Sequence, residues 1–429
     1  MGSGRCGGLN PQRMSEAKLD LTPSQHVVIV GAGHAGGSAA AFLRQHGYIG
    51  SISLIGAEPL APYQRPPLSK AWLAGAADED TLQLRPFRFY ADHNIGLRLD
   101  TRVDSIDRQA GRVNLTGGAS VPYDRLILAT GARARAAPFA AASLKTVLEL
   151  RTAADAEKLK QALRPGARLV IVGGGYVGLE AAASARALGV EVTVVEREPR
   201  LLARVACVQL SEFFARYHRL RGVTLRLGRS VASIEEHSGQ PTIVSLDDGN
   251  KLAADRVLVG VGAVPNQELA FAAGLPCDDG VVVDTAARTA DPRIHAIGDC
   301  TRRPIPRYGR QWRLESVSNA LEQARQAAAA ICAKPPPPAE IPWFWSDQFD
   351  SKLQIAGLPI DVIDVVVRGD PHSNRFAVFH IGAGGRLQSV EAINAAPEFM
   401  MGRQLISVGR KLNLELLRNP DISMKEVAI

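Results

Sequence analysis

Short apolar runs alternate with helical patterns along the first part of the chain. The first run, His26–Val30, is rich in β-branched residues, and a second strand-like run follows at Ser51–Ile55. An alanine-rich stretch with the character of a buried helix lies between them and ends near Gly47. Strand, helix and strand in this order are typical of a βαβ unit with parallel strands. The pattern therefore predicts an α/β fold.

The turn after the first strand contains three glycines at the spacing Gly31-x-Gly33-x-x-Gly36. Gly31 allows a tight turn, Gly33 lets a pyrophosphate approach the backbone, and Gly36 lets the helix pack closely on the strand. The N-terminus of that helix would present free N–H groups and a positive dipole to the phosphates. Because a strand precedes the motif and a helix follows it, this segment is predicted to bind a dinucleotide.

The same arrangement occurs a second time further along the chain. A strand at Arg168–Val172 leads into Gly173, Gly175 and Gly178, and a helix and another strand follow. Glu196 ends that strand, where a carboxylate can accept hydrogen bonds from both hydroxyls of an adenosine ribose. A 2′-phosphate would meet a like charge there, so the residue favours NADH over NADPH. The next residue is an arginine, which would weaken that preference if it faced the ligand.

Two further segments decide which nucleotide the first unit binds. A strand-like run ends in Thr130-Gly131, and a later run, beginning at Ile294, leads into Gly298-Asp299. The carboxylate of Asp299 would then meet a polyol chain. Small residues after one strand and a Gly-Asp pair after a later one are what flavoproteins with two dinucleotide folds show. The first unit is therefore predicted to bind FAD and the second a nicotinamide nucleotide.

The order of these motifs is similar to that of the glutathione-reductase-type flavoproteins. Within that superfamily, the chain resembles the putidaredoxin reductase-like ferredoxin reductases that serve bacterial cytochromes P450 and ring-hydroxylating dioxygenases. The resemblance covers nearly the whole chain after residue 25. The segments that carry it are Arg65–Lys70 (RPPLSK), Gly173–Glu180 (GGGYVGLE), Gly262–Asn266 (GAVPN), Glu315–Gln323 (ESVSNALEQ) and Trp343–Gln348 (WFWSDQ).

The resemblance implies roles for individual residues. The implied FAD contacts are Gly31, Gly33, Gly36, Glu58, Arg65, Lys70, Thr130, Gly131, Asp299, Val317 and Trp345. The implied NADH contacts are Gly173, Gly175, Gly178, Glu180, Glu196 and Gly262. Lys70 and Glu180 are expected to lie together at the junction of flavin and nicotinamide, as the catalytic residues. Glu58 departs from the family pattern, because the acidic residue usually ends the second strand directly.

The implied fold class is α/β, with two Rossmann-like dinucleotide-binding domains followed by a C-terminal α+β domain. Residues 24–143 and 267–336 would form the FAD-binding domain, and residues 144–266 the NAD-binding domain inserted into it. Residues 337–429 would form the C-terminal domain, after the stiff proline-rich spacer Lys334–Pro338. Residues 1–23 lack the apolar core of a signal peptide and are predicted to be a flexible tail.

The implied reaction passes a hydride from NADH to FAD and then single electrons to a [2Fe-2S] ferredoxin. Two alternatives stay open: a rubredoxin reductase, and a redox-sensing flavoprotein similar to apoptosis-inducing factor. Disulfide reductases of the superfamily are disfavoured, because no cysteine lies between Gly31 and Lys70. The five cysteines are scattered and lack the spacings typical of metal ligation, so no metal is expected.

The chain carries 50 basic and 43 acidic residues, a formal charge of +7. The excess is compatible with an acidic protein partner, and no motif indicates nucleic acid. No apolar run is long enough to span a membrane, so a cytoplasmic protein is expected. A monomer or weak homodimer is expected as well. The first candidates for a basic docking face are Arg302, Arg303, Arg307 and Arg310.

Overall fold

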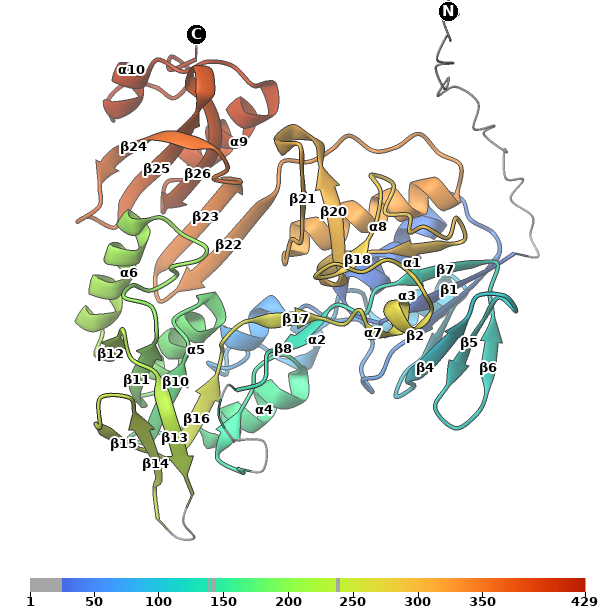
Figure 1. The fold of residues 1–429 in the computed structure, drawn as a ribbon, viewed down its shortest axis with the longest axis horizontal. Helices are drawn as coiled ribbons and strands as arrows, with labels where there is room; N and C mark the ends of the chain where they lie inside the picture. The colour runs from blue at the N-terminus through green and yellow to red at the C-terminus, as the bar shows by residue number, and fades with distance from the viewer. Residues whose placement is uncertain (1–24, 138, 140–143, 237–239, 429) are drawn as a thin grey trace, which may run out of the picture.

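The computed structural model describes residues 25–137, 139, 144–236 and 240–428 (Figure 1). The predicted tail at residues 1–23 lies outside this range. The described chain forms two parallel sheets flanked by helices and one antiparallel sheet near the C-terminus. This arrangement confirms the predicted fold class. None of the described helices combines the length and the apolar character that a membrane span requires.

The first sheet is entirely parallel and has the order β19-β7-β1-β2-β3. Its strands are β1 (His26–Val30), β2 (Ser51–Ile55), β3 (Ile95–Arg98), β7 (Arg125–Leu128) and β19 (Ile294–Ala296). Helices α1 (His34–Gln45) and α8 (Val317–Ile331) pack together in its main core cluster. The apolar run in β1 is continuous because both faces of this strand are buried. Strand β19, which completes this sheet, comes after the second dinucleotide unit in the sequence.

The second sheet repeats this design with the order β12-β11-β10-β16-β9, again parallel throughout. Its strands are β9 (Val147–Leu148), β10 (Arg168–Val172), β11 (Glu191–Glu196), β12 (Val223–Leu227) and β16 (Arg256–Val259). The accompanying helices are α4 (Ala153–Ala162), α5 (Tyr176–Ala187) and α6 (Val208–Leu220). The buried side of α5 contacts β10 and β11.

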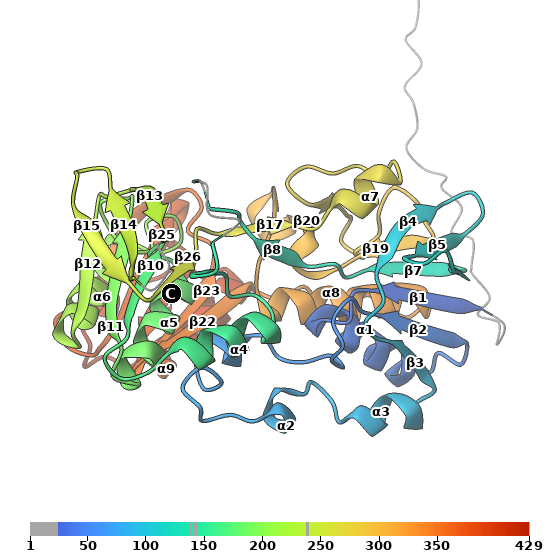
Figure 2. The ribbon, with the colours of Figure 1, turned by 90° about the horizontal axis from the view of Figure 1, so that it is seen from below.

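A short antiparallel pair joins the two parallel sheets. It consists of β8 (Ala132–Ala134) and β17 (Ala263–Pro265). Figure 2 shows these two strands running between the two ends of the molecule. The chain therefore passes from the first sheet to the second along β8 and returns along β17.

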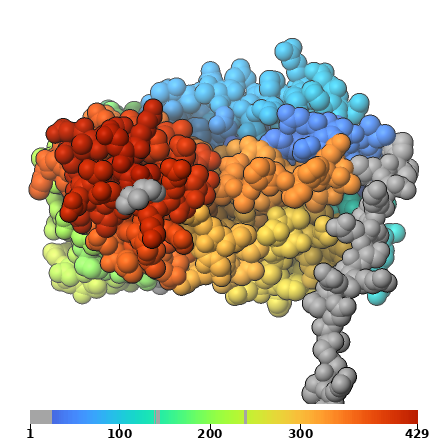
Figure 3. All heavy atoms as spheres, turned by 90° about the horizontal axis from the view of Figure 1, so that it is seen from above, coloured from blue at the N-terminus to red at the C-terminus, as the bar shows by residue number. Residues whose placement is uncertain are grey.

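The third sheet is antiparallel, with the order β22-β23-β26-β25-β24. Its strands are β22 (Trp343–Gln348), β23 (Ser351–Gly357), β24 (Val362–Asp370), β25 (Arg375–Gly382) and β26 (Arg386–Ile393). Helices α9 (Ala396–Val408) and α10 (Leu414–Arg418) cover one face. The other face packs against α6 through a shared apolar cluster that includes Phe213 and Phe376. The space-filling view shows this C-terminal part at one end of the molecule (Figure 3).

Smaller elements complete the described chain. Two three-stranded antiparallel sheets consist of β4 (Val103–Asp107), β5 (Arg112–Leu115) and β6 (Ser120–Pro122), and of β13 (Val231–Glu235), β14 (Thr242–Leu246) and β15 (Lys251–Ala254). A further three-stranded sheet, with one parallel and one antiparallel pairing, contains β18 (Val281–Val282), β20 (Thr301–Ile305) and β21 (Arg310–Trp312). The short helices are η1 (Pro66–Ser69), α2 (Glu79–Leu82), α3 (Phe87–Asp92), α7 (Glu268–Ala272), η2 (Gly298–Cys300), η3 (Pro306–Tyr308) and η4 (Ala383–Gly385).

Candidate active site

A cavity of about 700 Å³ lies where the three sheets meet. Its walls come from η1, the turn between β10 and α5, the end of β11, the N-terminus of α8 and strand β22. Most of the predicted site residues line it: Arg65, Lys70, Gly173, Gly175, Gly178, Glu180, Glu196, Gly262, Asp299, Val317 and Trp345. The size is within the range of small-molecule and cofactor sites.

The first glycine turn has the geometry that its sequence predicts. Gly31 adopts φ +112°, and a Cβ there would lie 2.1 Å from the carbonyl oxygen of Ala129. A Cβ on Gly36 would lie 1.9 Å from the carbonyl oxygen of Gly31, so helix and strand are in close contact. Nothing lies within 4 Å of the corresponding position at Gly33. The backbone at Gly33 is therefore open to a ligand at the N-terminus of α1, as a pyrophosphate requires.

The second glycine turn repeats this geometry closely. Gly173 has φ +111°, and its Cβ would lie 2.4 Å from the carbonyl oxygen of Gly260. A Cβ on Gly178 would lie 2.6 Å from the carbonyl oxygen of Gly173, whereas Gly175 faces open space. The chain thus contains two turns of the dinucleotide-binding kind, one at the start of α1 and one at the start of α5.

The two predicted catalytic side chains are in direct contact. The ammonium group of Lys70 lies 2.8 Å from Oε2 of Glu180, and both side chains are largely buried. The hydroxyl of Ser69 donates to the same Oε2 at 2.6 Å, and the hydroxyl of Ser346 donates to Oε1 at 2.6 Å. The Glu180 carboxylate is therefore held by groups from η1 and β22, while it is itself part of α5. The position of Lys70 in the cavity is therefore fixed by η1, α5 and β22, which are distant from one another in the sequence.

The hydrogen bonds continue from this pair into the interior. Gln348 donates through Nε2 to the Ser346 hydroxyl at 3.1 Å, and its Oε1 lies 2.8 Å from Nε2 of His218. All three side chains are buried. Burial lowers the pKa of His218 from 6.5 to about 4, so the imidazole is neutral at physiological pH. A neutral imidazole that donates to Gln348 fixes the orientation of this amide and, through it, of Ser346.

The other end of the cavity contains Glu196 at the end of β11. Its Oε2 accepts a hydrogen bond from the N–H of Gly174 at 2.6 Å, and its Oε1 accepts one from the N–H of Glu198 at 2.8 Å. These bonds hold the carboxylate beside the second glycine turn. Arg197 is exposed and forms an ion pair with Glu198 at 3.2 Å. The acidic group at this position is therefore part of the cavity wall, as the sequence predicts.

The side of the cavity next to α1 contains residues that were not predicted from the sequence. Asp299 forms an ion pair with Arg151 at 2.8 Å, and both residues line the cavity. His34, at the start of α1, also lines it, and its buried Nδ1 has no hydrogen-bond partner among the described residues. Burial lowers the pKa of His34, and the charge of Asp299 only partly opposes this effect. An unsatisfied nitrogen beside Gly33 is consistent with a ligand that supplies the missing bond.

Sequence motifs contain some of the cavity residues that were not predicted, but not all of them. Ser69 and Ser346 lie inside the segments RPPLSK and WFWSDQ, so their motifs already marked them. Arg151 belongs to none of the motifs, and only the tertiary structure places it beside Asp299.

Six predicted site residues do not line the cavity: Gly31, Gly33, Gly36, Glu58, Thr130 and Gly131. The carboxylate of Glu58 instead contacts Arg65 at 2.6 Å and accepts a hydrogen bond from Tyr63 at 2.6 Å. The hydroxyl of Thr130 donates to the carbonyl of Asn266 at 2.7 Å. Glu58 thus positions Arg65, which does line the cavity, and Thr130 ties the first sheet to the end of β17.

The prediction that Arg303 belongs to a basic docking face is wrong. Its guanidinium is buried and forms an ion pair with Glu322 at 2.8 Å, because β20 packs against α8. Arg302 contacts Asp278 at 3.3 Å, and Arg310 contacts Asp361 at 2.7 Å. Arg307 is exposed at the end of the hairpin. The charge available to a partner here is smaller than the sequence suggested.

Two dinucleotide turns on either side of a buried Lys–Glu pair define a flavin-dependent pyridine-nucleotide oxidoreductase. Residues 25–324 match the family described as pyridine nucleotide-disulphide oxidoreductase, and residues 343–428 match the family described as reductase C-terminal. The chain belongs to the pyridine nucleotide-disulphide oxidoreductase family.

Its similarity to individual proteins extends over nearly its whole length. It is 47% identical to a probable ferredoxin reductase, CtmF, from Castellaniella defragrans over 95% of this chain and 100% of that protein. It is 44% identical to rhodocoxin reductase from Rhodococcus erythropolis, covering 93% of each chain. A crystal structure of the covalent putidaredoxin reductase–putidaredoxin complex matches with a TM-score of 0.92 and 41% identity, covering 94% of this chain and 98% of that one. The family resemblance drawn from the sequence is confirmed.

Proposed function

We propose that this protein transfers hydride from NADH to FAD and passes single electrons to a [2Fe-2S] ferredoxin. That ferredoxin would supply a cytochrome P450 or a ring-hydroxylating dioxygenase, and we place the enzyme in the cytoplasm. The observation that carries the proposal is the buried Lys70–Glu180 pair in a cavity whose wall includes the second dinucleotide turn and His34, which follows the first turn at the start of α1. FAD supplies the chemistry that the chain lacks, because it accepts two electrons together and releases them one at a time.

The residues on the first-sheet side suit FAD. The open backbone at Gly33 and the N-terminus of α1 would hold the pyrophosphate. The unsatisfied nitrogen of His34 offers a further polar contact. Asp299 would accept hydrogen bonds from the ribityl hydroxyls, while Arg151 keeps its carboxylate in place. Val317 and Trp345 would supply apolar walls.

The residues on the second-sheet side suit NADH. Gly175 leaves the same space for a pyrophosphate at the N-terminus of α5. Glu196 presents a carboxylate that would accept from the adenosine ribose hydroxyls and repel a 2′-phosphate. Its two backbone hydrogen bonds would keep the carboxylate fixed beside the second glycine turn when the nucleotide binds.

Lys70 and Glu180 supply the electrostatics of the reaction. The Lys70 ammonium presents a positive charge in the cavity, where hydride delivery brings negative charge. Glu180 keeps that ammonium from turning away, and the hydroxyls of Ser69 and Ser346 keep Glu180 from turning. The pair is thus organised before the substrate binds, so the reaction does not have to reorganise it.

The proposal is tested by mixing NADH rapidly with the FAD-loaded enzyme and following flavin absorbance. Lys70→Met should slow flavin reduction by about a hundredfold, the effect of removing one well-placed electrostatic group. Lys158→Met removes an exposed lysine outside the cavity and should leave the rate unchanged. Equal rates in the wild type and in Lys70→Met would refute a role for Lys70 in hydride transfer.

The electron acceptor is identified by steady-state turnover with purified partners. A [2Fe-2S] ferredoxin should support fast electron transfer to a reporter such as cytochrome c, and rubredoxin should support it poorly. A preference for rubredoxin would replace the proposed acceptor, while poor turnover with both, and with ferricyanide, would favour a redox sensor. Flavin reduction by NADH is measured separately, so a wrong acceptor does not affect the hydride-transfer assignment.

A further inference from the structure

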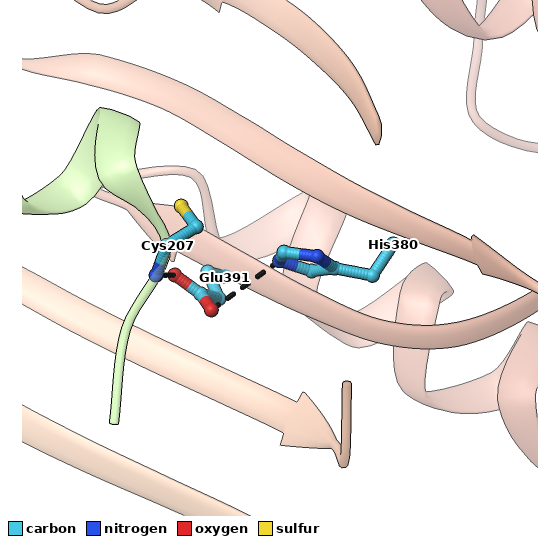
Figure 4. A group of neighbouring side chains, drawn as sticks. All are labelled: Cys207, His380 and Glu391. Atoms are coloured by element: carbon cyan, nitrogen blue, oxygen red, sulfur yellow. Dashed lines mark hydrogen bonds and ion pairs between the residues drawn. The ribbon is translucent and has the colours of Figure 1, made fainter. Parts of the chain in front are cut away.

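Outside the cavity, Cys207, His380 and Glu391 form a cluster of potential metal ligands (Figure 4). Cys207 is the residue before α6, whereas His380 lies on β25 and Glu391 on β26. One ligand atom from each lies within 4.8 Å of the others. Oε1 of Glu391 is 3.3 Å from Nε2 of His380, and Oε2 accepts a hydrogen bond from the N–H of Cys207 at 3.1 Å.

The surroundings of this cluster make its polar groups unusual. His380 and Glu391 lie in the face of the third sheet that packs on α6, where the neighbouring side chains include the apolar Val378 and Ile393. Their side chains are 6% and 3% exposed. Burying a carboxylate and an imidazole in apolar surroundings is costly unless both are well bonded. The burial of His380 and Glu391 therefore suggests that these two side chains have a function.

The imidazole of His380 points into the cluster but is not satisfied by it. Figure 4 shows the ring directed towards the carboxylate of Glu391. Although Nε2 is close to that carboxylate, the contact does not have hydrogen-bond geometry, and no other described residue bonds this buried nitrogen. A buried ring nitrogen without a hydrogen bond, close to a thiol and a carboxylate, is the arrangement that a metal ion would satisfy.

We propose that Cys207, His380 and Glu391 bind one Zn²⁺ ion, with water as the fourth ligand. A thiolate, an imidazole and a carboxylate together suit zinc, whereas Mg²⁺ and Ca²⁺ select oxygen ligands alone. Bonds of about 2.0–2.3 Å in a tetrahedral site separate the ligand atoms by roughly 3.3–3.8 Å. The observed ligand atoms lie within 4.8 Å of one another, so they would have to move closer together to reach that spacing. The thiol proton leaves to solvent when the metal binds.

Such an ion would join two parts of the molecule. Cys207 belongs to the connection between β11 and α6, beside the second sheet, and the other two ligands belong to the third sheet. The carbonyl of Val205, two residues before Cys207, accepts a hydrogen bond from Tyr176 at 3.2 Å, and both residues line the nucleotide cavity. Zinc would therefore fix this part of the cavity wall. Metal binding itself can be tested whether or not the proposed reaction is correct.

The spacing rules used on the sequence could not reveal this site. Local motifs such as CxxC bring ligands together within one turn or loop. Here His380 and Glu391 lie on the adjacent strands β25 and β26, whereas Cys207 lies far from them in the chain, and packing of α6 on the third sheet brings the cysteine to the other two ligands.

The test uses untagged, FAD-loaded protein that has been treated with EDTA and dialysed. All variants carry Cys6→Ser, since that thiol lies outside the described residues and could bind metal independently. Zn²⁺ is titrated in competition with a chromophoric chelator. We expect one equivalent of tight zinc, a higher melting temperature with zinc, and no competition from Mg²⁺.

Variants of each ligand make the test specific. Cys207→Ser, His380→Gln and Glu391→Gln should each weaken zinc binding at least about tenfold, a loss that even indirect metal partners can cause. Cys277→Ser, at a half-buried thiol elsewhere, should bind like the parent. Zinc bound equally well by the parent and by Cys207→Ser would overturn the proposal.

A measurement on the parent protein covers the case in which the variants do not fold. Co²⁺ in a tetrahedral site with a thiolate ligand absorbs strongly in the red, beyond the flavin bands. Addition of one equivalent of Co²⁺ should produce this absorption, and Zn²⁺ should abolish it. Its absence would overturn the proposal without any substitution.

Discussion

At the scale of single residues, the carboxylate of Glu196 sets the expected choice of nucleotide. It is held by two backbone N–H groups beside the second glycine turn, so its negative charge has a defined position in the cavity. That position lies where the 2′-position of an adenosine ribose is expected. Nucleotide preference should therefore depend on this side chain more than on the exposed Arg197.

We expect Glu196→Ala to narrow the preference for NADH over NADPH. Loss of a charge-assisted hydrogen bond of about 1.5–3 kcal/mol should weaken NADH binding about tenfold or more. Loss of like-charge repulsion should at the same time improve NADPH binding. The ratio of kcat/KM for the two nucleotides measures this, with Glu191→Ala at the exposed start of β11 as the control. A wild-type enzyme that prefers NADPH would contradict the assignment of Glu196.

His295 gives a prediction about pH and stability. It lies on β19, fully buried, and neither ring nitrogen has a hydrogen-bond partner among the described residues. Burial, together with the charges of Arg288 and Arg125, lowers its pKa from 6.5 to about 3. The imidazole of His295 is therefore protonated below about pH 6.5 in the unfolded chain, but only below about pH 3 in the folded chain. Stability is lost over that window as the pH falls.

We expect His295→Met to remove this loss of stability in acid. Within this window, a buried histidine of this kind lowers the free energy of unfolding by about 1.4 kcal/mol for each unit by which the pH falls. The difference in the free energy of unfolding between variant and wild type should therefore be about 2 kcal/mol more favourable to the variant at pH 5 than at pH 7. Urea unfolding of the FAD-loaded protein at the two pH values measures this, with His372→Met at an exposed histidine as the control. A difference that is independent of pH would show that His295 does not titrate as described.

At the scale of elements, strand β22 couples the third sheet to the catalytic pair. Ser346 and Gln348 on this strand bond Glu180 and His218, which belong to α5 and α6. The neighbouring Trp345 and Phe344 line the cavity, so a single strand contributes both apolar walls and buried hydrogen bonds. The C-terminal part of the chain is thus a component of the active site.

We expect Ser346→Ala to slow flavin reduction although Ser346 touches no substrate. The substitution leaves the buried Oε1 of Glu180 without its donor, a loss of about 1–3 kcal/mol that lets the Lys70–Glu180 pair shift. Ser346→Thr retains a hydroxyl and should restore most of the rate. Rapid mixing with NADH measures the rate, and bound FAD per chain shows whether folding is intact. If Ala and Thr behave alike, the hydroxyl does not position Glu180.

The boundaries of the elements were largely accessible from the sequence. The predicted strands His26–Val30, Ser51–Ile55 and Arg168–Val172 have the bounds of β1, β2 and β10. The apolar, β-branched runs of β1 and β10, each followed by a glycine, leave little freedom of assignment, since both faces of these two strands are largely buried. The domain boundaries themselves remain a proposal.

At the scale of the whole molecule, the net charge of +7 favours an acidic redox partner. Electron transfer needs short encounters, so we expect a small and largely electrostatic interface. Burial of Arg303 removes one charge from the region first considered, and ion pairs of Arg302 and Arg310 reduce the rest. The partner would therefore meet dispersed charges more than a single arginine cluster.

We expect ferredoxin-dependent turnover to fall as salt rises, because exposed charges are screened beyond about 8 Å at physiological ionic strength. Turnover with ferricyanide serves as the control for an effect of salt on the enzyme itself. Arg307→Glu should lower the association rate, while Arg112→Glu, on the β4–β6 sheet, should change it less. If salt affects both acceptors equally, docking is not electrostatic, and the hydride-transfer assignment remains.

The sequence by itself determined the features whose causes are local. A glycine turn between a strand and a helix depends on residues within a few positions of one another, so the two dinucleotide units, the fold class and the family could be predicted. Contacts between distant segments were decided only by the tertiary structure. Arg151 reaches Asp299, Ser346 reaches Glu180 and Glu322 reaches Arg303 because separate elements pack together. No local pattern encodes which of many distant polar side chains will meet, because that choice depends on how all the sheets and helices pack.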